Sequence, residues 1–206
     1  MLFILDRLGD PCQDGADVPP GAVRTIRSQR KLQKLDFLVR NPDYLANAII
    51  SACEEGRLPA ERLLDAKKIL FEREPELHTY RMLRNQHGAY EFLDDAMSVL
   101  RHLGLVQVRR VGRITDSHVK RRNYYLLEAG AEQAMRLRDE EPILAWYDEQ
   151  TAYAADAVRG LSAEQMKRWQ YDQPEYASTP LGQLIGGIAE RVERRLEAAL
   201  AEKGLG

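Results

Sequence analysis

The sequence predicts an α+β protein that is mainly α-helical and contains one small β-hairpin. Apolar residues recur every three or four positions in most segments, which is typical of amphipathic helices. One segment, 106–127, differs because β-branched and aromatic residues flank a polar turn there, and this pattern indicates a hairpin. The predicted fold is therefore a set of helices interrupted by a single hairpin.

The composition indicates a globular protein. The chain has 206 residues, of which 44% are hydrophobic and 30% charged, enough for one sizeable domain or a domain with a small appendage. No apolar run approaches the roughly 20 residues that span a bilayer, and the opening MLFILDRLGD lacks the basic lead-in of a secretory signal. Cys12 and Cys53 are too few for a disulfide framework. We therefore expect a reduced cytoplasmic protein without a membrane partner.

The N-terminal part is expected to be helical, apart from one loop. A short apolar helix over 1–8 precedes a loop over 10–21 that is rich in Asp, Gly and Pro. Ser28 is expected to cap a helix that Asn41-Pro42 ends, and Asp43 is expected to cap the next one. Apolar spacing and flanking Gly or Pro residues predict further helices over 44–56, 59–74, 75–88 and 89–104.

The order of elements around the hairpin predicts a winged helix. A helix that ends at Gly104 leads into a strand from Val106, a turn at Thr115-Asp116-Ser117 and a second strand over 119–127. Helical periodicity then resumes. Helix, strand, basic turn, strand and helix follow one another in winged helix-turn-helix domains. We therefore predict such a domain over residues 1–138, with its wing at about 106–127, followed by C-terminal helices over 139–206.

An apolar stripe near the C-terminus predicts a partner surface. A helix is expected over 142–158, another begins at Ser162, which forms a capping motif with Gln165, and a third covers 181–204. The stripe of this last helix must be buried, either against the chain's own domain or against a second copy. We favour a homodimer, because a twofold pair would present two wings to twofold DNA. The residues expected at that dimer interface are Leu181, Leu184, Ile188, Val192, Leu196 and Leu200.

Charge is distributed unevenly, although the net charge is only −2. Residues 106–138 contain eight Lys and Arg against three Asp and Glu, whereas residues 139–206 contain seven against thirteen. Flexible cations on a hairpin can neutralise the phosphates of a duplex and release counterions. The alternative is a solvated hairpin whose charges protect an exposed edge from aggregation. The residues expected to contact DNA are Arg109, Arg110, Arg113, Lys120, Arg121 and Arg122 of the hairpin, with Arg27, Arg30, Lys31 and Lys34 of a second basic cluster.

Acidic residues at the start of the helix before the hairpin argue against sequence reading by that helix. A recognition helix presents its N-terminal residues to base edges, and here these residues are Glu91, Asp94 and Asp95. Carboxylates repel phosphates, although acids in a first helical turn also complement the helix dipole. We therefore expect the hairpin, and not this helix, to make the main DNA contacts.

Four short motifs along the chain are similar to a known family pattern. They are Arg30-Lys31-Leu32-Gln33-Lys34-Leu35, His87-Gly88-Ala89-Tyr90, the stretch from Tyr125 to Gly130, and the segment LSAEQMKRWQYDQPEYASTPL. Together they resemble the YwgA-like winged-helix proteins of bacteria and archaea, with an Ala in place of a Pro in the second motif and a Leu in place of a Thr in the third. PadR-type regulators, which join a winged helix to dimerisation helices, share the hairpin pattern. The resemblance implies a DNA-binding-like domain and no particular operator, and some winged-helix modules bind only proteins.

No catalytic or metal-binding pattern stands out. The sequence contains no G-x-S-x-G, Walker loop or G-x-G-x-x-G, and its four histidines lack the spacing of a zinc site. We therefore expect neither an enzyme nor a bound cofactor or metal. The predicted function is a cytoplasmic DNA-binding protein that regulates transcription as a homodimer on double-stranded DNA. The alternative is a protein-interaction module of an antitoxin or defence-operon type, which binds a protein partner and does not read DNA.

Overall fold

The structure is a computed structural model that describes residues 1–13, 15, 17–71, 82–85, 88–90, 93–111 and 121–205. It divides into two compact units, each formed by two separate stretches of the chain. The first unit contains Met1–Asp36 and Glu91–Asp148, and the second contains Phe37–Tyr90 and Glu149–Gly206. This division differs from the boundary that we predict after residue 138, because the second unit begins inside the predicted winged-helix domain.

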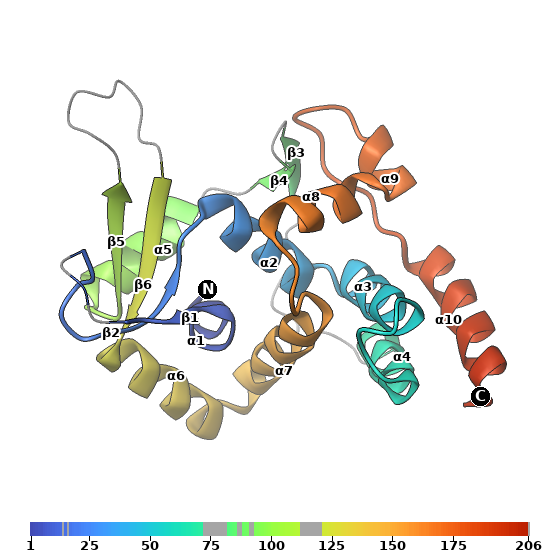
Figure 1. Ribbon diagram of the computed structural model, residues 1–206, viewed down its shortest axis with the longest axis horizontal. Coiled ribbons are helices and arrows are strands. Elements are labelled where there is room, and N and C mark those ends of the chain that lie inside the picture. The colour runs from blue at the N-terminus through green and yellow to red at the C-terminus, as the bar shows by residue number, and fades with distance from the viewer. Residues whose placement is uncertain are drawn as a thin grey trace. The chain divides into compact units, whose positions relative to one another are not determined.

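A small antiparallel sheet and several helices form the first unit. They are α1 (Leu2–Leu8), β1 (Asp10–Pro11), β2 (Ala22–Ile26), α5 (Leu93–His102), β5 (Val106–Val111), β6 (Arg121–Leu127) and α6 (Glu128–Glu140). Among the described residues the sheet has four strands in the order β1-β2-β6-β5, so that β2 extends the β5–β6 hairpin on the side of β6 (Figure 1). The prediction of a mainly helical α+β protein is confirmed, and the strands of the predicted hairpin pair as β5 and β6. The sequence does not predict β1, which lies in the expected loop, or β2.

Two helices belong partly to each unit. They are α2 (Gln29–Arg40) and α7 (Pro142–Ala157). The Lys31 backbone N–H donates to Ser28 Oγ at 3.2 Å, which confirms Ser28 as the cap of α2. None of the helices in the described part of the chain is long and apolar enough to cross a bilayer.

The second unit is mainly helical. Its elements are α3 (Pro42–Glu54), the 3₁₀ turn η1 (Ala60–Arg62), α4 (Leu63–Phe71), β3 (Leu83–Asn85), β4 (Gly88–Tyr90), α8 (Ala163–Tyr171), α9 (Pro174–Ser178) and α10 (Ala189–Lys203). Ser162 and Gln165 form the predicted capping box of α8. The prediction of a helix over 75–88 is wrong for Leu83–Asn85, because this segment is a strand that pairs with Gly88–Tyr90. The backbone N–H of Arg84 also donates to the Gln183 carbonyl at 2.8 Å. Its hydrogen bond is therefore made to another segment, as in a sheet, and not within a helix.

The C-terminal apolar stripe is used mainly within the chain. Helix α10 packs against α3 and α4 (Figure 1), and four of the six stripe residues are at most 5% exposed: Ile188, Val192, Leu196 and Leu200. The expected dimer contact is therefore corrected for these four, because the chain's own helices already cover them. Leu181 and Leu184 are 62% and 56% exposed, and they precede α10 because this helix begins only at Ala189.

Candidate nucleic-acid interface

The basic side chains of the hairpin are divided between the two faces of the sheet. Strand pairing joins Arg109 to Asn123, Arg110 to Arg122, and Val111 to Arg121. Since neighbouring side chains of a strand point to opposite faces, Arg109 and Arg121 share one face and Arg110 and Arg122 share the other. The predicted basic hairpin therefore consists of two separate groups of arginines.

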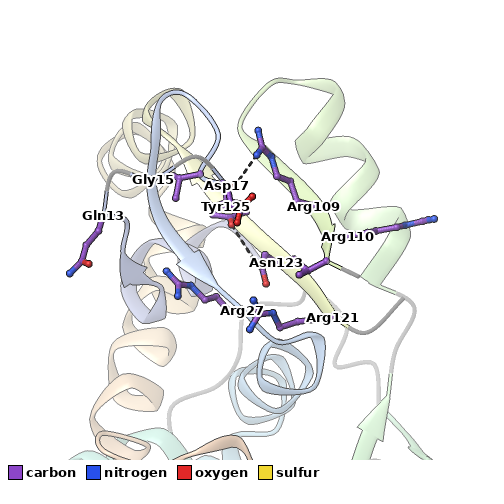
Figure 2. A pocket seen from close by; sticks show the side chains of 11 residues that line it. Gln13, Gly15, Asp17, Arg27, Arg109, Arg110, Arg121, Asn123 and Tyr125 are labelled. Atoms are coloured by element: carbon purple, nitrogen blue, oxygen red, sulfur yellow. Dashed lines mark hydrogen bonds between the residues drawn. The ribbon is translucent and has the colours of Figure 1, made fainter. Parts of the chain in front are cut away.

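The face that carries Arg109 and Arg121 borders a basic hollow of about 580 Å³ (Figure 2). We call it the arginine hollow. In the view of Figure 2, Arg109 lies toward one end of it and Arg27 and Arg121 toward the other, whereas the Arg110 side chain points away from them. The residues that line it are Gln13, Gly15, Asp17, Val18, Arg27, Arg109, Arg110, Val111, Arg121, Asn123 and Tyr125. All of them belong to the first unit.

Strand β2 brings Arg27 to the hollow. Thr25 pairs with Tyr125 and Ile26 with Tyr124 of β6. Arg27 follows two residues after Thr25, so it continues the face that carries Tyr125 and Asn123. The cap at Ser28 then turns the chain into α2, which leaves Arg27 at the exposed end of the strand. Pairing between segments far apart in sequence therefore joins the two basic clusters at Arg27.

Arg109 is held by a neutral partner. Its Nη1 donates to the Asp17 backbone carbonyl at 2.9 Å, and the Val18 N–H donates to the Gly15 carbonyl at 3.0 Å in the same segment. The contact fixes the direction of the guanidinium but leaves its charge uncompensated. Among the described residues no carboxylate forms an ion pair with Arg27, Arg109 or Arg121. The hollow therefore has a positive charge available for an anion.

Asn123 is a buried polar residue in the wall of the hollow. Its side chain is 5% exposed, and its Nδ2 donates to the Tyr125 hydroxyl at 3.1 Å. Its Oδ1 is buried and accepts no hydrogen bond from any described residue. A buried carbonyl oxygen without a donor destabilises the folded state by about 1–3 kcal/mol. Asn123 therefore places an unsatisfied acceptor in the wall of the hollow.

The opposite face of the hairpin is partly neutralised. Arg122 Nη1 lies 3.0 Å from Asp94 Oδ1 in the first turn of α5. Arg110 is exposed, and its side chain points away from the arginine hollow (Figure 2). The acidic start of α5 thus compensates one of the arginines that we expect to contact DNA.

The remaining predicted residues have different positions. Arg113 and Lys120 lie outside the described residues. Arg30 is exposed and Lys31 is half-buried at the start of α2. Lys34 is only 2% exposed, and its Nζ lies 3.5 Å from the Arg30 carbonyl. The expectation that Lys34 contacts DNA is therefore corrected, because a duplex cannot reach a buried ammonium.

Sequence reasoning does not identify Asn123 and Tyr125 as site residues. The only signal is the single Asn between the basic pair Arg121-Arg122 and the apolar stretch that begins at Tyr124. Metal chemistry has no support from side-chain grouping, because no cluster of three His, Cys, Asp or Glu that could hold an ion occurs in the described parts of the chain. A comparison with family models, curated proteins and solved structures finds no match for this chain.

Proposed function

We propose that the first unit is a winged-helix domain that binds double-stranded DNA through the basic side chains of its hairpin, and that the protein regulates transcription. The order of elements supports the proposal. Helix α5 ends at His102, and Gly104, which has a φ of +68°, follows it just before β5 begins at Val106. The β5–β6 hairpin then acts as the wing, and β2 extends its sheet. The YwgA-like resemblance of the sequence implies the same fold.

The observation that carries the proposal is the group formed by Arg27, Arg109 and Arg121. These arginines share one face of the sheet, and none of them forms an ion pair with a carboxylate in the described part of the chain. Guanidinium groups bind phosphate oxygens through paired N–H donors. Neutralising several backbone phosphates supplies most of the sequence-independent affinity for a duplex. The proposal assigns the protein to the cytoplasm, where its free thiols Cys12 and Cys53 stay reduced.

The dimer that we expect from the sequence is not part of this proposal. Its contacts depended on a continuous apolar stripe, and α10 buries most of that stripe against α3 and α4. A single domain can bind DNA through phosphate contacts without a twofold partner.

Fluorescence anisotropy with a labelled duplex at two salt concentrations tests the proposal. We expect the Arg109→Ala/Arg121→Ala variant to bind about tenfold more weakly, and the slope of log affinity against log salt to fall by about two. The matched control is Arg168→Ala/Arg194→Ala, which removes two exposed arginines from the second unit. The proposal fails if the wild type does not bind at low salt, or if the two double variants bind equally.

A second candidate function has one specific observation in its favour. Helix α5 exposes Val99 and Leu103, with 61% and 60% of each residue accessible, and its first turn is acidic. Apolar side chains on an acidic helix suit a protein partner better than a duplex. A Val99→Ser/Leu103→Ser variant, which changes no charge, distinguishes the two functions: it should leave duplex binding within about twofold if only phosphates at the hairpin matter. It should abolish recovery of a stoichiometric protein partner if α5 is a protein-binding surface.

A further inference from the structure

We propose that the arginine hollow is a binding site for a small phosphorylated compound of about mononucleotide size that also carries a hydroxyl or amino hydrogen-bond donor. The site and its ligand class do not depend on DNA binding. The argument uses the charge, the unsatisfied polar atom and the volume of the hollow.

The charge of the hollow selects an anion. Arg27, Arg109 and Arg121 line it together, and Arg109 donates a hydrogen bond to a backbone carbonyl, which is a neutral partner. Planar guanidinium groups offer parallel N–H donors that match phosphate oxygens. Two of the three arginines are exposed, so they can turn toward a ligand that enters from solvent. A phosphate group satisfies this part of the site.

Asn123 selects the other part of the ligand. Its Nδ2 donates to the Tyr125 hydroxyl, and its Oδ1 accepts no hydrogen bond from any described residue. The fully ionised phosphate group of a monoester carries only acceptors and cannot donate to a carbonyl oxygen. A ligand that also brings an O–H or N–H can donate to Oδ1 when the exposed side chains of Arg27 and Arg121 turn toward its phosphate.

The volume of the hollow favours a ligand larger than a bare phosphate. A hollow of about 580 Å³ lies within the range of small-molecule sites, roughly 300–1,000 Å³. Inorganic phosphate would fill only a small part of it. Apart from Val18 and Val111, the lining side chains are mainly polar, so the rest of the ligand is polar too. Sugar phosphates and mononucleotides combine this size, a phosphate and several donors.

Isothermal titration calorimetry on the full chain tests the site with four probes. They are adenosine 5′-monophosphate, ribose 5-phosphate, inorganic phosphate and adenosine. We expect at least one of the first two to bind about tenfold or more tightly than inorganic phosphate, because its phosphate can pair with the arginines while a separate hydroxyl or amino group donates to Asn123, and we expect no binding of adenosine. The proposal is overturned if neither phosphorylated compound binds more tightly than inorganic phosphate.

Variants connect the binding to these residues. Arg27→Ala/Arg121→Ala should weaken the tighter ligand by about tenfold or more, whereas the matched control Arg168→Ala/Arg194→Ala should not. Asn123→Leu keeps the approximate size of the side chain and removes its polar atoms. It should retain inorganic phosphate binding and a melting temperature at or above that of the wild type, but lose the preference for the larger ligand. Unchanged preference in Asn123→Leu contradicts the role of Oδ1 and overturns the proposal.

The proposed DNA function and the ligand site can fail separately. If the protein binds the ligand but no duplex, the proposed ligand site stands and the proposed DNA function fails. If it binds duplex but none of the phosphorylated probes, only the proposed DNA function stands. If both hold, Arg109 and Arg121 are shared, and the ligand should displace labelled duplex in the anisotropy assay. This last consequence rests on the proposed function, whereas the calorimetric result does not.

Discussion

Arg122 and Asp94 join the hairpin to the helix that precedes it: Nη1 of Arg122 donates to Oδ1 of Asp94 at 3.0 Å. The Asp94 side chain is 71% exposed and that of Arg122 is 27% exposed. A pair this open to solvent contributes about 0–1 kcal/mol to folding. Its larger effect is on the electrostatic potential that an approaching duplex meets.

Removal of the Asp94 charge should therefore strengthen DNA binding. In Asp94→Asn, Arg122 is released to a phosphate and a repulsive carboxylate is lost, so affinity should rise about threefold at low salt and less at high salt. The measurement is duplex anisotropy at two salt concentrations. Glu132→Gln, an equal charge change at an exposed position of α6, is the control. Equal affinities for Asp94→Asn and Glu132→Gln would contradict the DNA contact.

A second prediction concerns acid stability of the first unit. Arg7 Nε and Arg138 Nε both donate to Asp148 Oδ1, at 2.7 and 2.8 Å, and Arg138 also pairs with Asp6. Burial opposes ionisation of Asp148, but the hydrogen bonds from Arg7 and Arg138 outweigh it and lower the pKa of the carboxyl below its usual value. The unfolded chain has a pKa of about 3.9 at this residue. The carboxylate therefore stabilises the fold fully above about pH 5, and this contribution is lost as the pH falls through the folded-state pKa.

The Asp148→Asn variant tests the direction of this pH dependence of stability. The variant should lower the free energy of unfolding by about 2 kcal/mol at pH 7, because the pair is only partly buried, and the difference from wild type should shrink as the pH falls below the unfolded-state pKa of about 3.9. Urea unfolding at several pH values measures it. Asp139→Asn, at an exposed position of α6, should show no such pH-dependent difference. A difference between Asp148→Asn and wild type that stays constant down to pH 3 would show that ionisation is not its cause.

A third prediction separates the two parts of the C-terminal stripe. Leu196 is 2% exposed in α10, whereas Leu181 is 62% exposed before it. Leu196→Ala should lower the free energy of unfolding by about 2–5 kcal/mol, and Leu181→Ala should change it by less than about 0.5 kcal/mol. Chemical unfolding measures both. The mass of Leu196→Ala in solution should equal that of wild type, and dissociation of an oligomer in this variant would show that the stripe pairs two copies.

The hairpin could be predicted because its signal is local. β-Branched and aromatic residues on either side of Thr115-Asp116-Ser117 lie within one short stretch. Strand β2 has the same kind of composition but pairs with β6, whose residues are far away in sequence. It also follows a Pro-Gly pair that favours a loop. Local sequence patterns therefore could not predict β2, because this strand depends on a partner that is distant in sequence.

The candidate site shows the same limit. Charge alone identifies Arg27, Arg109 and Arg121, but the faces on which they lie depend on the register, and a one-residue shift would reverse them. The burial of Lys34 likewise depends on packing, because its neighbours Arg30 and Lys31 remain accessible. For α10 the periodicity correctly indicates an apolar face. The identity of the elements that cover it, α3 and α4, follows only from the tertiary structure.

A fourth prediction explains the glycine at the end of the motif YYLLEAG. Gly130 is buried in the first turn of α6, and a Cβ there would lie 2.3 Å from the Leu105 carbonyl oxygen and 2.7 Å from Leu126 Cδ1. That carbonyl accepts the Leu127 N–H at 3.0 Å, so the added methyl group would disturb the bond that ties α6 to the start of the hairpin. Gly130→Ala should lower the free energy of unfolding by about 1–3 kcal/mol. Gly186→Ala, where no atom lies within 4 Å of the new Cβ, is the control. Equal melting temperatures for the two variants would mean that α6 can move away from Leu105 without cost, and that the glycine is not required by close packing.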